Sequence, residues 1–186
     1  MNRRNFLSLP LAAVALTALG RAAGPGAPGA KRIGRGYRVG AQKDRHDAAL
    51  LAMGGRFDLK VSGEDTGGDL CIFDTVRWEK GGPPLHRHHA QDEWFYVIRG
   101  EFIVRVGDDT VKLSAGDSAF APRRVPHAFA NVSDGEAQML VLFQPAGTME
   151  DFFRAMSQLG KGVAGAIPAR LWEEHGMELL GPPLKI

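Results

Sequence analysis

Histidines gather in one short stretch of this chain. Four of the six lie between residues 86 and 127, namely His86, His88, His89 and His127. Successive side chains of a β-strand point to opposite faces. On a strand, His86 and His88 therefore share one face, and His89 points to the other. Two imidazoles in that arrangement can hold one metal ion.

Two further residues can complete such a site. Glu93 begins the next apolar run after a short bend, and His127 begins a later strand-like run. Three imidazoles and one carboxylate suit a divalent transition metal such as Mn, Fe, Co, Ni, Cu or Zn, whereas Ca and Mg prefer oxygen ligands. Each piece alone is more often a surface pair or a strand-end charge. Their joint spacing predicts metal ligation by His86, His88, Glu93 and His127.

That spacing falls into two motifs. The first is a Gly-Pro-rich entry, then His-x-His, four residues, Glu, six residues and Gly, and it ends at Gly100. The second contains Gly116, Pro122, His127 and Asn131. Together they resemble the two motifs of the cupin superfamily, whose ligand positions carry over to the same four residues. Arg124 stands where the family usually has glycine, so the turn before His127 is expected to differ.

Short strand-like runs alternate with turn signals through the middle of the chain. The runs are Asp69–Trp78, Glu93–Ile98, Phe102–Val106, Val111–Leu113, Ser118–Ala121, His127–Val132 and Gln138–Phe143. This pattern predicts an all-β sandwich or barrel. The resemblance implies a double-stranded β-helix, or jelly-roll barrel, with the metal inside one end. Asp47–Met53 is predicted as a short helical turn.

The C-terminal part changes period. Apolar residues at helical spacing predict a helix over Met149–Leu159, and a second short helix is expected over Pro168–Glu174. We expect both helices to pack over one end of the barrel, and we interpret Trp172 and Met177 as core residues.

Strand parity also predicts a substrate pocket. Phe95 and Val97 share the parity of Glu93, and Phe129 shares that of His127. We expect these three to line an apolar cavity around the metal. Asn131, also on the parity of His127, is predicted to support the ligands from behind or to be structural. His89 and Asp92 are expected to face away.

The first residues have the layout of an export signal. A basic start precedes an apolar run from Leu7 to Leu19, which is too short for a bilayer core of about 30 Å. Arg3-Arg4-Asn5-Phe6-Leu7 resembles the twin-arginine signal, with a general secretory signal as the alternative. The predicted divisions are a signal peptide (1–23), a flexible basic linker (24–45), the barrel (46–147) and C-terminal helices with a tail (148–186).

Cleavage of the predicted signal peptide would change the net charge of the chain. The 186 residues hold 23 basic and 21 acidic side chains. Residues 1–22 contain three arginines and no acid, so their removal leaves 20 and 21. This balance excludes a strongly basic nucleic-acid surface. The single cysteine excludes an intrachain disulfide and a cysteine-based zinc cluster. We predict a periplasmic or otherwise extracytoplasmic protein, exported by the twin-arginine machinery and able to form a homodimer.

The sequence around the first motif looks most like quercetin-dioxygenase-like cupins. That resemblance implies a metal-dependent dioxygenase that uses O2 on a small enol or flavonol-like aromatic substrate, with Glu93 as the catalytic base. The alternatives are a non-catalytic protein that binds a metal or small ligand, and an isomerase or decarboxylase that needs no O2. Folding before export would favour Mn or Fe, because copper and zinc win by raw affinity outside the cytoplasm.

Overall fold

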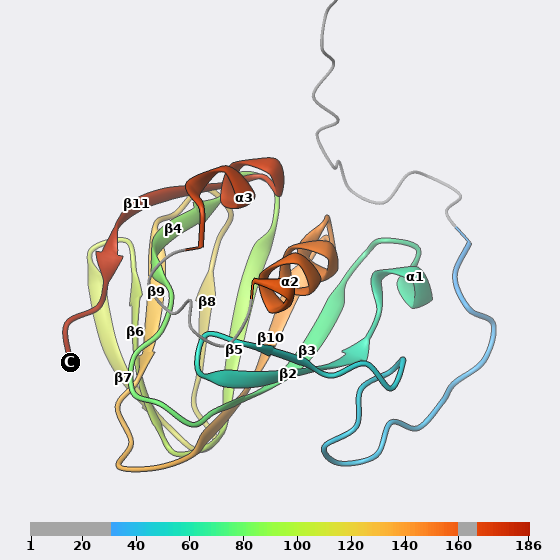
Figure 1. Ribbon diagram of the computed structural model, residues 1–186, viewed down its shortest axis with the longest axis horizontal. Helices are drawn as coiled ribbons and strands as arrows, with labels where there is room; N and C mark the ends of the chain where they lie inside the picture. Colours follow the sequence, from blue (N-terminus) through green and yellow to red (C-terminus); the bar gives the residue numbers. More distant parts are fainter. Residues whose placement is uncertain (1–30, 160–166) are drawn as a thin grey trace, which may run out of the picture.

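Two antiparallel sheets form the body of the molecule. The computed structural model describes residues 31–159 and 167–186, and it is drawn in Figure 1. The strands are β1 (Leu50–Ala52), β2 (Gly55–Val61), β3 (Cys71–Arg77), β4 (Pro84–His88), β5 (Asp92–Arg99), β6 (Glu101–Val106), β7 (Asp109–Ser114), β8 (Ser118–Ala121), β9 (His127–Asn131), β10 (Ala137–Gln144) and β11 (Met177–Pro183). The helices are α1 (Gly63–Thr66), α2 (Met149–Gln158) and α3 (Ala169–Glu174).

The strand order is that of a double-stranded β-helix. One sheet runs β1-β2-β3-β10-β5-β8 and the other β11-β4-β9-β6-β7. Strand β3 pairs with β10, β4 with β9, β5 with β8 and β6 with β7, so a folded-back ribbon winds from one sheet to the other. The predicted all-β jelly roll with short C-terminal helices is confirmed.

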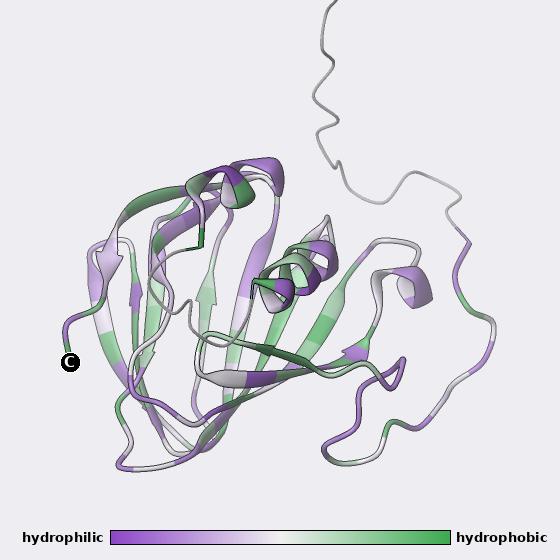
Figure 2. Cartoon of the chain, in the orientation of Figure 1, coloured by the Kyte–Doolittle hydropathy of each residue, from purple (hydrophilic) through white to green (hydrophobic). Residues whose placement is uncertain are grey.

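The space between the sheets is filled by apolar side chains. Alternation along β5 buries Phe95 and Val97 and leaves Tyr96 and Ile98 exposed. Figure 2 shows apolar and polar segments alternating along the strands. Rings from both sheets meet inside, for example Phe95 with Phe129 at 5.6 Å and Phe102 with Phe129 at 6.2 Å between centroids. Burial of such rings is the main stabilising term for a small barrel.

The N-terminal strands differ from the sequence prediction. Residues 47–53 were expected to form a helical turn, but Leu50–Ala52 is a strand that pairs with β2. Met53 and Gly54 form the two-residue turn between them, with φ angles of 46° and 64°. Turns of this kind need positive φ and match the twist of the flanking strands. The pairing with β2, which local sequence does not show, decides the conformation.

Part of the predicted linker is held to the barrel. The Ile33 amide donates to the Asp65 carbonyl at 3.1 Å, and the Arg45 amide donates to the Leu59 carbonyl at 2.7 Å. The Tyr37 hydroxyl donates to Asp65 at 2.7 Å. Within residues 31–45, the expectation of a free linker is therefore corrected. The predicted signal peptide and residues 24–30 lie outside the described residues.

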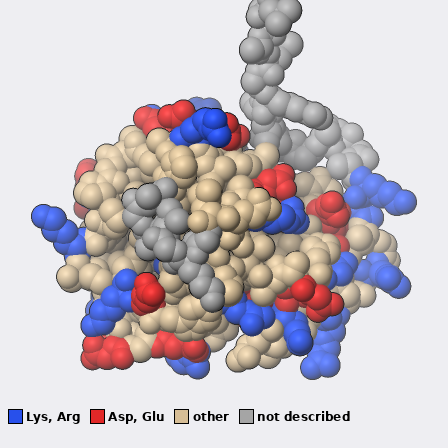
Figure 3. All heavy atoms as spheres, in the orientation of Figure 1, with Lys and Arg blue, Asp and Glu red and all other residues tan. Residues whose placement is uncertain are grey.

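The C-terminal segment closes one side of the barrel. Strand β11 pairs with β4, with Met177 opposite His88. Helix α3 lies beside β11, and α2 lies against β1 (Figure 1). In the described residues, no helix has the length and hydropathy needed to cross a membrane. Charges of both signs are interspersed on the face seen in Figure 3.

Candidate metal centre

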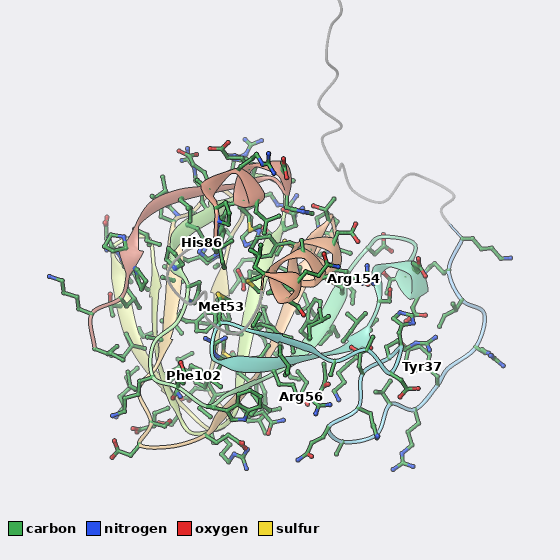
Figure 4. The ribbon with its side chains drawn as sticks, in the orientation of Figure 1. Tyr37, Met53, Arg56, His86, Phe102 and Arg154 are labelled. Carbon is green, nitrogen blue, oxygen red and sulfur yellow. The ribbon has the colours of Figure 1, made fainter. Side chains whose placement is uncertain are left out.

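Three strands bring four side chains to one point inside the barrel. His86 and His88 lie on the inner face of β4, Glu93 lies near the start of β5, and His127 begins β9 directly opposite His86. One ligand atom from each lies within 4.8 Å of the others. The exposed fractions of the four residues are between 1% and 5%. Figure 4 shows His86 on the barrel, well away from Tyr37 and Arg154.

Backbone carbonyls fix the tautomers of two imidazoles. His86 Nδ1 lies 2.8 Å from the Pro84 carbonyl oxygen, and His127 Nδ1 lies 2.9 Å from that of Val125. A carbonyl oxygen only accepts, so both Nδ1 atoms carry a proton. In the neutral rings, the Nε2 lone pairs then face the interior. Metal-binding histidines commonly have this arrangement, in which a hydrogen bond from the other ring nitrogen, here Nδ1, orients the ring.

The Nε2 atoms meet a carboxylate that also only accepts. Glu93 Oε2 lies 2.8 Å from His127 Nε2 and 3.2 Å from His88 Nε2. A lone pair facing a carboxylate at this distance is repulsive unless a proton or a cation lies between them. Neither ring nitrogen of His88 has a hydrogen-bond partner in the part of the chain that the structure describes. A metal ion bound between these donors would complete the cluster.

The pKa values follow from burial and from these contacts. Burial, together with the neighbouring His127 and His88, lowers the pKa of His86 to about 3. Burial acts to raise the pKa of Glu93, but hydrogen bonds and charge from His127 and His88 outweigh it and lower the pKa. For His127, burial lowers the pKa, and contact with Glu93 more than reverses this and raises it. These contacts therefore favour the anionic form of Glu93.

The donor set fits a divalent transition metal. Imidazole nitrogens and one carboxylate oxygen are ligands of intermediate softness, and such an ion would satisfy one of the two unpartnered nitrogens of His88. Four protein ligands leave positions open on an ion of five or six coordination. An open position is what a metal site needs to bind a small molecule.

A small apolar cavity adjoins three of the four residues, His86, His88 and Glu93. Its volume is about 30 Å³, close to the space of one water molecule in the liquid. Its wall contains Phe129 from β9, Phe143 from β10, Phe152 from α2, Trp172 from α3 and Met177 from β11. Glu93 is the only carboxylate among the residues that line it. A site this dry strengthens every electrostatic contact inside it.

The predicted pocket residues are placed differently from one another. Phe129 lines the cavity, whereas Phe95 and Val97 are fully buried in the core and are not among the lining residues. The Phe95 ring does pack against the His127 ring, at 6.3 Å between centroids. Glu93, Phe95 and Val97 all point to the inner face of β5, as predicted. Of the three, only Glu93 reaches the cavity wall.

The remaining predicted neighbours lie away from the donors. Asn131 donates to the carbonyl oxygens of Glu79 at 3.1 Å and Gly135 at 3.4 Å, and it accepts from the Ser133 amide at 2.9 Å. It therefore braces two loops. Of the two predicted roles for Asn131, support of the metal ligands or a structural role, the contacts are those of the structural one. His89 is exposed, and Asp92 pairs with Arg123 on the outer side.

Sequence reasoning missed the cover of the cavity. Trp172 and Met177 were interpreted as core and are buried in it, but together with Phe152 they also wall the site. The Trp172 ring packs on His86 at 5.0 Å, and the Phe143 ring packs on His88 at 5.5 Å between centroids. The helical apolar spacing after residue 149 predicted a buried face, but it did not show which end of the barrel that face covers.

The turn before His127 keeps a glycine-like conformation without glycine. Arg124 has a φ of 68°, in the left-handed region that favours glycine. Its amide donates to the His88 carbonyl at 2.7 Å. The turn thereby ties His127 to the strand that carries His88.

The comparisons with known proteins agree with this geometry. Residues 74–143 match the family model described as Cupin domain. The barrel has the cupin fold. A solved RmlC-like cupin from Shewanella frigidimarina is 25% identical, with a TM-score of 0.50, over 63% of this chain and 96% of that one. The family match and the neighbouring fold support the cupin superfamily, whose members commonly bind a metal.

Two curated relatives match this chain over 67 residues each. An uncharacterised protein of Streptomyces coelicolor is 31% identical over 67 residues, which is 36% of this chain and 63% of that protein. An uncharacterised protein of Methanocaldococcus jannaschii is 24% identical over 67 residues, covering 36% and 54%. The match spans less than two thirds of the length of either relative.

Proposed function

We propose that this cupin is a metal-dependent dioxygenase that acts on a small enol. The observation that carries the proposal is the placement of Glu93, the only carboxylate on the wall of an apolar cavity, within hydrogen-bond distance of an imidazole in a set of four metal-ligand donors. His86, His88, His127 and Glu93 would hold the metal. The ion would act as a Lewis acid that makes a bound hydroxyl easier to deprotonate.

The chain's own residues then have separate tasks. Glu93 is anionic, because its contacts with His127 and His88 lower its pKa, so its carboxylate can accept the hydroxyl proton of the substrate. His127 Nε2 lies 2.8 Å from Oε2 and would act as a metal ligand, so it takes no part in the proton transfer. The rings of Phe129, Phe143 and Phe152 exclude water from the deprotonated substrate.

The size of the cavity narrows the substrate. A volume of about 30 Å³ cannot hold a flavonol skeleton. We therefore propose a small enol or diketone, and its entry requires the wall to move. Met53, Met149 and Met177 line the cavity, and methionine changes rotamer more readily than branched or aromatic residues. Movement of these side chains is the least costly way to enlarge the site.

The test is O2 consumption with a panel of small enols and diketones. Glu93→Gln keeps the size of the side chain and one coordinating oxygen, but it cannot accept a proton at neutral pH. We expect it to retain metal and to lose about 10²–10⁴-fold in turnover. Glu136→Gln, at an exposed ion pair with Arg99, is the matched control and should leave turnover unchanged.

Other results assign the site differently. Turnover of the same substrates without O2 uptake would indicate an isomerase or decarboxylase. Stoichiometric metal with no turnover of any substrate would favour a binding protein. Full turnover by a metal-loaded Glu93→Gln protein would exclude Glu93 as the base and leave it as a ligand.

The metal and the site of action form a second, linked proposal. We propose export by the twin-arginine route, with Mn or Fe bound before export. Replacing Arg3-Arg4 by Lys-Lys should retain the protein in the cytoplasm, still folded and metal-loaded, as fractionation and metal analysis would show. Export at the normal rate would point to a general secretory signal. Copper or zinc in protein exported by the native host would contradict the choice of metal.

A further inference from the structure

Trp172 is the one indole in the cavity wall. It lies on α3, is 2% exposed, and its ring is held between His86 and Phe152, each at 5.0 Å between ring centroids. Figure 1 shows α3 lying beside β11, over the end of the barrel where β4 carries the histidines. The ring is thus fixed by packing within contact distance of a metal-ligand donor.

The indole nitrogen of Trp172 lacks an acceptor. Nε1 is buried, and none of residues 31–159 and 167–186 accepts its hydrogen. An indole N–H can only donate, and a buried donor without an acceptor costs free energy that native proteins avoid. The carboxylate of Glu93, which shares the cavity wall, is engaged by His127 and His88. The missing acceptor is therefore one that a bound molecule brings.

We propose that Trp172 Nε1–H donates a hydrogen bond to an oxygen of the ligand that occupies this cavity. The inference rests on the proposed function and deepens it. A ligand with a single hydroxyl needs only the metal and Glu93, whereas a second oxygen is satisfied by Trp172. The site then selects molecules with two neighbouring oxygens, such as an enolised diketone or a carboxylate, over those with one.

The experiment uses the zinc-loaded full chain labelled with ¹⁵N in its three indole groups. Trp78, Trp94 and Trp172 give three indole signals, and Trp172→Phe identifies the third. We expect acetylacetone to move the Trp172 signal downfield and to leave the other two in place. Acetate, which brings two oxygens without an enol, should do the same.

Affinity gives a second reading. Trp172→Phe keeps an aromatic ring but removes the donor, so we expect the Kd for acetylacetone, measured by calorimetry, to rise about tenfold. Trp94→Phe, at a partly exposed tryptophan outside the cavity, is the matched control and should bind as the original protein does.

The outcomes separate this inference from the proposed function. If acetylacetone binds but the Trp172 signal stays in place and the Phe variant binds equally well, the inference is overturned and the enol site stands. If acetate moves the signal but acetylacetone does not bind, the donor role stands and the enol substrate is wrong. If neither probe moves the signal, the inference is overturned. Trp78→Phe and Trp94→Phe identify the other two signals, so the spectra of the original protein decide this even where Trp172→Phe does not fold.

Discussion

Two buried carboxylates in this barrel have opposite surroundings. Asp65, in α1, and Glu93, at the start of β5, are 8% and 4% exposed. In both, hydrogen-bonding neighbours outweigh the effect of burial and hold the pKa below its usual range. The two groups nevertheless differ in whether neighbouring hydrogen-bond donors fully satisfy the carboxylate oxygens.

Asp65 is completed by the chain itself. It accepts from the Tyr37 hydroxyl at 2.7 Å, from the Ser62 amide at 3.1 Å, and from Arg45 through Nε and Nη2 at 3.1 Å each. Ser62 and Asp65 also form the capping box of α1. Every partner of Asp65 is a true donor, and one is a permanent cation, so nothing further is needed.

Glu93 is not completed in this way. Its neighbours are the Nε2 atoms of His127 and His88. A neutral His127 ring carries its one proton on Nδ1, which faces the Val125 carbonyl, so a second proton or a cation must lie between His127 and Glu93. The comparison separates a structural acid from a functional one. A buried carboxylate with a full set of donors anchors the fold, whereas one that faces lone pairs marks a place for a cation.

The largest expected effect is on metal affinity at the incomplete cluster. His86→Ala removes one of three imidazoles, and we expect the affinity to fall by more than about 100-fold, beyond the loss typical of a residue that only supports a ligand. His89→Ala is the control, because His89 is exposed. Titration with a metal indicator measures both. If His86→Ala and His89→Ala lost the same metal affinity, the cluster around Glu93 would not be a metal site. The contrast between Glu93 and Asp65 would then fail.

Asp65→Asn should act on stability alone. Removing the charge leaves Arg45 and Tyr37 with a poorer acceptor, and we expect a loss of about 2–3 kcal/mol in the free energy of unfolding. Metal affinity should not change. Asp69→Asn, at an exposed pair with Arg32, should cost less than about 1 kcal/mol. Urea unfolding checks both, and a metal-affinity change in Asp65→Asn would break the separation.

Low pH should remove the same stabilisation by the Asp65 carboxylate. The pKa of Asp65 is lower in the folded protein than in the unfolded chain, where it is about 3.9. The stabilisation is therefore present above the unfolded value and is lost as pH falls through the folded value. Below about pH 4, the stability difference between the original protein and Asp65→Asn should shrink. A difference that stays constant from pH 6 to pH 2 would contradict this assignment.

The smallest expected effect is on stability, and it concerns two turns: the one after Asp65 and the one before His127. Helix α1 ends at Gly67, with φ of 66°, whereas the turn before His127 has Arg124 with φ of 68°. Arg124→Gly should stabilise the protein by about 1 kcal/mol, because glycine adopts this region without strain. Arg124→Ala, which keeps the strain, should not. A thermal-unfolding comparison in which alanine equals glycine would show that the turn is unstrained.

Much of the barrel was predictable because its signals are local. Alternation predicted the inner face of β5, and the parity of His86, His88 and His89 predicted which of the three turns outward. The short strand at residues 50–52 and the long one at 177–183 were not predicted. Each forms by pairing with a distant or later strand, β2 and β4, and their own residues carry little signal.

The candidate site divides in the same way. The sequence determined the four donors and the face on which each lies, because a period of two residues is a property of the chain itself. Only the tertiary structure decided that Phe95 and Val97 lie in the core, that Asn131 braces loops, and that the cavity is as small as it is. Trp172 reaches His86 only because α3 and β11 fold back on β4. Which distant segments share a wall depends on how whole elements pack, and local periodicity carries no record of that.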